Sequence, residues 1–159
     1  MNRRRESAGL LMFRRCDTRG AEVLLAHPGG PFWEGRHEGA WSIPKGGRDV
    51  HETPLEAALR EFREETSFEP TGPFHELGQI TQRSGKKVHA WAFEGNCDPA
   101  LSRSITTQTE WPPRSGRFIE VPEVDKVAFF LIEDARLVIN AGQARLLDRL
   151  ITLLATLKA

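Results

Sequence analysis

Residues 53–66 constrain the fold more than any other part of the chain, because several local signals there specify a helix. Thr53 and Glu56 have the spacing of a capping box, and Pro54 stands at the first helical position. The apolar residues recur at the spacing of one buried face: Leu55, Ala58, Leu59 and Phe62. We therefore predict an amphipathic helix that packs one face on the core.

The same helix carries a group of acidic residues beside its apolar face. At 100° per residue, Glu61, Glu64 and Glu65 fall within an arc of roughly 100°. Protonation, exposure to water or a hard divalent cation would each relieve their mutual repulsion, and an all-oxygen cluster suits Mg²⁺ or Mn²⁺. The alternative is a solvated surface on which Arg60 pairs with Glu64, and the helix taken alone favours it.

The sequence before the helix changes this balance. Gly46 and Gly47 precede a loop that ends at Glu52, and glycines there allow a sharp turn or a close approach to a ligand. Residues 46–68 resemble the Nudix box, G-x5-E-x7-R-E-U-x-E-E-x-G-U, where U is apolar. Ser67 stands where the family has the glycine that ends the helix. The other eight of nine defined positions match: Gly46, Glu52, Arg60, Glu61, Phe62, Glu64, Glu65 and Phe68.

This resemblance implies a fold, a cofactor and a set of roles. The implied fold is an α/β (α+β) Nudix fold, with a mixed β-sheet sandwiched between helices. Arg60 is similar to the family residue that orients the glutamates by ion pairing. The implied ligands of Mg²⁺ or Mn²⁺ are Glu61, Glu64 and Glu65, with Glu52 as an added or water-linked ligand and the backbone carbonyl of Lys45.

Hydrolysis of a diphosphate needs charge neutralisation, an activated water and a stabilised leaving group. In Nudix enzymes the base that takes the proton of the water is a box glutamate or a glutamate from a later loop. Glu64 is our first choice. The loop candidates are Glu110, Glu120 and Glu123, and the sequence does not rank them.

Substrate contacts are predicted from the loops. The segment WSIPKG is similar to the box entry of dinucleoside-polyphosphate and RNA-end pyrophosphohydrolases, so we expect Lys45 to meet a phosphate. Trp33, with its neighbour Phe32, and Trp111 lie in Pro- and Gly-rich loops where a ring can stack on a base, and Arg114 can pair with a phosphate. The alternative for Lys45 is a solvated lysine, and for the rings and Arg114 it is ordinary loop packing.

The rest of the chain interleaves strand and helix patterns, which favours an α/β or α+β sandwich. A polar turn is expected at residues 17–20 and a functional or mobile loop at 27–39. Helices are expected at 133–139 and 141–157. Strands are expected at 9–13, 22–26, 75–82, 88–94 and 127–132, with a looser candidate at 117–121 and a short extended segment at 41–43 that Pro44 ends.

Composition sets the outer limits. A chain of 159 residues predicts one domain, 1–159, with a flexible basic end at 1–7. The 22 basic and 22 acidic residues cancel, so no global field favours a nucleic-acid polymer or a membrane as partner. Cys16 and Cys97 have neither disulfide-framework nor zinc-site spacing, and no apolar run suggests a span or a signal peptide, so we expect a cytoplasmic protein.

These observations predict a metal-dependent pyrophosphohydrolase acting on a nucleoside diphosphate derivative. A dinucleoside polyphosphate is favoured over ADP-ribose or a nucleoside triphosphate, an RNA 5′ end stays open as a substrate, and the assembly is a monomer or a homodimer. One alternative is a non-catalytic nucleotide-sensing Nudix module, which would lack box glutamates. Another is an isopentenyl diphosphate isomerase, whose extra reactive cysteine neither Cys16 nor Cys97 provides by its context.

Overall fold

A mixed β-sheet forms the middle layer of the molecule. The computed structural model describes residues 6–17 and 20–157. The strands follow the order β4-β5-β1-β2-β8, and β3 pairs with β1 beside this path. Only β1 and β5 run parallel among these pairs. The bounds are β1 Glu6–Cys16, β2 Gly20–Pro28, β3 Lys45–Gly47, β4 His75–Thr81, β5 Lys87–Glu94 and β8 Val124–Leu131.

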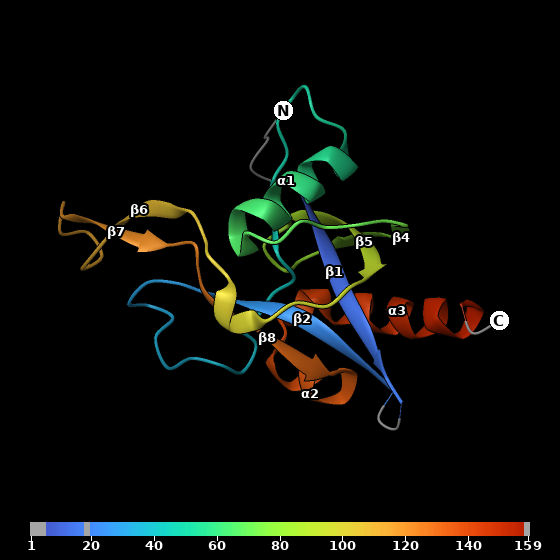
Figure 1. Cartoon of the computed structure of the whole chain (residues 1–159). Coiled ribbons are helices and arrows are strands. Elements are labelled where there is room, and N and C mark those ends of the chain that lie inside the picture. The colour runs from blue at the N-terminus through green and yellow to red at the C-terminus, as the bar shows by residue number, and fades with distance from the viewer. Residues whose placement is uncertain (1–5, 18–19, 158–159) are drawn as a thin grey trace.

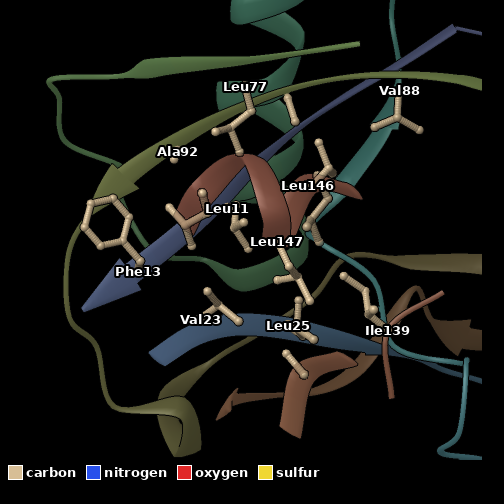
Figure 2. Close-up of a cluster of buried hydrophobic side chains, with 14 of the residues drawn as sticks. Leu11, Phe13, Val23, Leu25, Leu77, Val88, Ala92, Ile139, Leu146 and Leu147 are labelled. Atoms are coloured by element: carbon tan, nitrogen blue, oxygen red, sulfur yellow. The ribbon is translucent and has the colours of Figure 1, made fainter. Parts of the chain in front are cut away.

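Helices cover both faces of this sheet (Figure 1). Helix α1 (Pro54–Thr66) packs on one face, and α2 (Ile132–Val138) and α3 (Ala144–Thr156) pack on the other. Alternate residues of a strand point to opposite faces, so β1 serves both cores. Leu10 of β1 lies in the core under α1, and Leu11 lies in the core under α3, which Figure 2 shows together with Leu146 and Leu147. The expected sandwich is confirmed.

Strand β1 has two different partners along one edge. Its end near Cys16 pairs with β2, whereas Ser7 to Gly9 pair with β3. Strand β1 and the segment at residues 44–45 approach closely at Gly9, where a Cβ atom would lie 2.6 Å from both the Lys45 Cβ and the Pro44 carbonyl oxygen. Glycine is therefore required there, and this close crossing sets Lys45 and Gly46 beside α1.

The long loop between β2 and β3 is tied to the sheet at two points. The backbones of Ala26 and Ser42 exchange hydrogen bonds of 2.8 and 2.9 Å. The buried ring of His27 lies between the Asp125 carboxylate, 2.9 Å from Nδ1, and the Arg36 carbonyl, 2.6 Å from Nε2. These contacts anchor the loop to the start of β8.

A separate hairpin extends away from the sandwich (Figure 1). Strands β6 (Thr106–Glu110) and β7 (Phe118–Pro122) pair antiparallel, and Glu123 links β7 directly to β8. The base of the hairpin is fixed to α1, because the Ile105 amide donates to the Glu64 carbonyl and the Glu123 amide donates to the Ile105 carbonyl, both at 2.9 Å.

The other strands and helices expected from the sequence are confirmed, with shifted ends, but β3 and β6 were not predicted. Trp41 and Ser42 form only isolated bridges, to Ile139 and Ala26, and the strand β3 begins after Pro44 rather than before it. The last helix is shorter than expected, because residues 141–143 form a 3₁₀ turn before α3. Glu6 and Ser7 belong to β1, although we expected residues 1–7 to be flexible; residues 1–5, and residues 18–19 of the expected turn, lie outside the described part. Within the part that the structure describes, no helix combines the length and apolarity needed to span a bilayer.

Candidate metal and phosphate site

Helix α1 is capped at its two ends by the residues expected from the sequence, Thr53 and Ser67. The Thr53 hydroxyl accepts a hydrogen bond of 3.2 Å from the Glu56 amide, as the capping box requires. At the other end Ser67 adopts the left-handed conformation, with φ of 65°, that the family glycine would adopt. The helix therefore ends at the expected place despite the serine.

Three carboxylates, two from α1 and one from the junction of β7 and β8, form the centre of the site. Glu61 and Glu65 of α1 are buried, and Glu123 comes from the junction of β7 and β8. One carboxylate oxygen of each lies within 4.8 Å of the others. We call these three residues the acidic cluster.

Strand β3 lies directly against the acidic cluster. The Lys45 amide donates to a Glu65 oxygen at 3.3 Å. A Cβ atom at Gly46 would lie 2.1 Å from the carboxylate of Glu61. The absence of a side chain at Gly46 therefore provides the space in which Glu61 lies.

Arg60 holds the acidic residues on the outer side of the cluster. Its Nε and Nη2 atoms donate to the two oxygens of Glu52 at 2.7 and 2.9 Å. Its Nη1 atom donates to Glu61 at 2.9 Å and to Glu64 at 3.2 Å. A planar guanidinium with several fixed donors suits this arrangement, because it sets the orientation of several carboxylates at once.

Burial and mutual repulsion make the acidic cluster costly to ionise. Burial, followed by the charge of Glu61, raises the pKa of Glu65 to about 8. Burial also raises the pKa of Glu61 and of Glu123, and Glu64 adds to the effect at Glu123. The pKa of Lys45 is lowered, first by burial and then by Lys86.

The donor set of the acidic cluster fits a hard divalent cation. Carboxylate oxygens are the ligands that Mg²⁺ and Mn²⁺ prefer, and a cation between them offsets the repulsion that raises their pKa values. Glu61, Glu65 and Glu123 are the residues placed to hold such an ion together. Glu64 and Glu52, also expected among the ligands, bond to Arg60, as Glu61 of the acidic cluster does.

The loop candidates occupy different places. Among them, Glu123 belongs to the acidic cluster. Glu110 accepts hydrogen bonds from the amides of Arg114 and Gly116, at 2.8 and 3.2 Å, and so closes the turn of the hairpin. Glu120 accepts a hydrogen bond from the Thr106 hydroxyl on the hairpin.

The residues expected to bind substrate lie in two different regions, the cavity beside the acidic cluster and the hairpin. Trp33 and Lys45 line a cavity of about 210 Å³ beside the acidic cluster. Phe32 is exposed and meets the Trp33 ring edge to face at a centroid distance of 4.9 Å. Trp111 and Arg114 lie in the hairpin, away from this cavity.

Sequence reasoning missed several polar residues of the cavity wall. These residues are distant from the Nudix box in sequence and carry no motif of their own, so only the fold assembles them. They are Ser42, Gln82, Asn140 and Gln143.

A mixed sheet between helices, with carboxylates on a helix that follows a glycine pair, defines the class of the Nudix hydrolases. The family model described as NUDIX domain matches residues 3–150. The chain belongs to this family. The fold that the resemblance to the Nudix box implied is thereby confirmed.

Known relatives agree with this assignment. An RNA pyrophosphohydrolase of Xanthomonas campestris is 45% identical over 49 residues, which span 30% of this chain and 24% of that protein. An Ap4A hydrolase of C. elegans, solved as a binary complex, is similar in fold with a TM-score of 0.66 and 22% identity, over 94% of this chain and 98% of that one. The NUDIX domain of Shewanella oneidensis NrtR, complexed with ADP ribose, has a TM-score of 0.65 and 16% identity, over 97% and 90%.

Proposed function

We propose that this Nudix hydrolase cleaves a diphosphate linkage in a nucleoside diphosphate derivative, with dinucleoside polyphosphates favoured. The observation that carries the proposal is that Glu65 and Glu123 of the acidic cluster also line the cavity with Lys45. One wall can therefore hold a cation and a phosphate group together. The fold similarity to an Ap4A hydrolase and the local identity to an RNA pyrophosphohydrolase support a substrate of this class.

The acidic cluster is proposed to hold Mg²⁺ or Mn²⁺. Such a cation neutralises charge on the diphosphate and lowers the pKa of its bound water. Gly46 and the Lys45 amide keep Glu61 and Glu65 in place for it.

The chain's own groups have separate tasks in this proposal. Glu64, whose side chain is 32% exposed and bonded to Arg60, accepts the proton of the attacking water. Arg60, fixed by Glu52, orients Glu64 and Glu61. The ammonium of Lys45 offsets charge on a phosphate in the cavity, and Trp33 offers a ring for stacking.

The test is a hydrolysis assay of the purified chain with Mg²⁺ or Mn²⁺ against a panel of nucleotides. The panel contains dinucleoside polyphosphates, ADP-ribose, nucleoside triphosphates and a 5′-triphosphorylated RNA. We expect turnover of at least one of them, and a folded protein inert toward the whole panel would contradict the proposal.

Two isosteric variants separate proton transfer from metal binding. Glu64→Gln is expected to lower kcat by about 10² to 10⁴-fold, the contribution of a general base, while Mg²⁺ still binds. Glu123→Gln is expected to weaken Mg²⁺ binding as well. Near-normal turnover by Glu64→Gln would remove Glu64 from its proposed role.

A further inference from the structure

Side-chain amides contribute to the lining of the cavity beside the acidic cluster. The lining includes Lys45, Glu65 and Glu123 together with the amides of Gln82, Asn140 and Gln143. Its volume of about 210 Å³ is below the roughly 300–1,000 Å³ of sites that enclose a whole drug-sized ligand. The cavity therefore suits one portion of a nucleotide, with the rest lying outside.

The orientation of the Gln143 amide is fixed by the backbone. Gln143 is buried, and its Oε1 atom accepts a hydrogen bond of 3.0 Å from the Ile43 amide. A backbone N–H can only donate, so the oxygen of Gln143 must face Ile43. Its NH₂ group then faces Ser42 and Gln82, and it donates to the Ser42 hydroxyl at 2.9 Å and to Gln82 Oε1 at 3.1 Å.

This arrangement also fixes Gln82. Because Gln143 donates to it, the oxygen of the Gln82 amide faces Gln143 and its NH₂ group remains. Asn140 is set in the same way, since its oxygen accepts a hydrogen bond of 2.9 Å from the Gly142 amide and its NH₂ group remains. Among the residues that the structure describes, neither NH₂ group has a hydrogen-bond acceptor.

We propose that these two NH₂ groups select a guanine-type base. Guanine presents two neighbouring acceptors, O6 and N7, whereas adenine presents a donor at its 6-amino group beside N7. Two amide donors match the two neighbouring acceptors of guanine. With adenine, one of these donors would face the 6-amino group, which is itself a donor. The inference rests on the proposed function, because it names the base of the nucleotide whose phosphates lie at the acidic cluster.

The other cavity walls accept the flat faces of a base. Trp33 provides an aromatic ring, and Ala26, Ala40 and Val124 provide small or apolar surfaces. Stacking of this kind is favourable for every base, so it contributes affinity without selectivity. Selectivity then depends on the two NH₂ groups, and an unmatched polar group in such a site costs enough to give about 10-fold to 100-fold discrimination.

The experiment measures binding and turnover separately. Calorimetry with the full chain and Mg²⁺ compares GDP, IDP and ADP, and an assay compares kcat/KM for GTP and ATP. We expect GDP to bind at least ten-fold more tightly than ADP, and IDP to behave as GDP does because it keeps both acceptors. Equal affinities, or tighter binding of ADP, would overturn the inference.

Two variants replace a proposed hydrogen-bond donor by an acceptor while keeping the hydrogen bonds that hold each side chain in the cavity wall. Asn140→Asp and Gln82→Glu each replace the NH₂ group by an oxygen and retain the oxygen that accepts from Gly142 or Gln143. Each is expected to shift the GDP-to-ADP affinity ratio by ten-fold or more toward ADP. The same change at the exposed Gln108 of the hairpin is the matched control and is expected to leave the ratio unaltered.

The outcomes distinguish the inference from the function beneath it. Guanine-selective binding without turnover of any nucleotide would remove the proposed hydrolase activity and keep the base assignment. Turnover of guanine and adenine nucleotides at equal kcat/KM, with equal binding, would keep the proposed hydrolase activity and overturn the base assignment. If Asn140→Asp does not fold, Gln82→Glu alone decides, and an unchanged ratio in that variant counts against the inference.

Discussion

At the scale of single residues, Gly46 offers a direct test of how the acidic cluster is built. Alanine would place its Cβ 2.1 Å from the Glu61 carboxylate, so Glu61 would have to leave its present position in the acidic cluster. We expect Gly46→Ala to lower kcat/KM by about 10-fold to 100-fold, the usual effect of disturbing groups that position metal ligands. At Gly47 a Cβ would meet no atom within 4 Å, so Gly47→Ala is the control and should keep its activity.

The pKa of Glu65 predicts how the metal-free protein responds to pH. Its value of about 8 in the folded protein, against 4.5 in the unfolded chain, means that the folded state binds this proton more tightly. The stabilisation is complete below about pH 4.5 and is lost as the pH rises toward 8. In the presence of a metal chelator, the Tm of the native protein should fall as the pH rises from 5 to 8. In Glu65→Gln this decrease in Tm should be smaller. The exposed Glu34→Gln is the control, and equal slopes for both variants would refute the assignment.

The sequence could predict only part of the site at this scale. Glu61 and Glu65 were expected from helical spacing and the box, since local geometry determines both. Glu123 remained one of three loop candidates, because its position depends on how the hairpin returns to β8. The amides of Gln82 and Asn140 were missed, because contacts between distant segments bring them into the cavity.

At the scale of elements, Ser67 determines how α1 ends. Its φ of 65° is unfavourable for a residue with a Cβ, by about 1 kcal/mol relative to glycine, and its hydroxyl recovers part of this by accepting from the Arg103 amide at 3.2 Å. We expect Ser67→Gly to raise the free energy of unfolding by about 0.5 kcal/mol. Ser67→Ala keeps the strain and loses the acceptor, so it should lower that free energy. Urea unfolding measures both, and a Gly variant less stable than the Ala variant would be incompatible with this account.

Elements with a strong local pattern were the predictable ones. Helix α1 has a capping box and an apolar face, and strands such as β5 have β-branched and aromatic residues with apolar spacing. Strand β6 has the sequence TTQTE, which shows no apolar alternation because it lies in an exposed hairpin rather than on the core. It forms through pairing with β7, and a pattern that reports burial does not detect it.

At the scale of the whole molecule, the acidic cluster joins parts that are far apart in the chain. Glu61 and Glu65 lie on the helix over one face of the sheet, and Glu123 lies where the hairpin enters β8. A cation bound by all three would act as a crosslink that exists only in the folded state. Binding of this kind stabilises the fold by RT ln(1 + [L]/Kd), about 2.7 kcal/mol at a hundred-fold excess over Kd.

Mg²⁺ is therefore expected to raise the Tm of the native protein in a saturable way at constant ionic strength. Glu123→Gln should lose most of this increase, because the hairpin junction would no longer contribute its carboxylate. Glu120→Gln is the matched control, since that residue lies on the exposed hairpin and bonds to Thr106 rather than to the acidic cluster. If Glu123→Gln kept the full response to Mg²⁺, the ion would be held by α1 alone, and the crosslink between helix and hairpin junction would not exist.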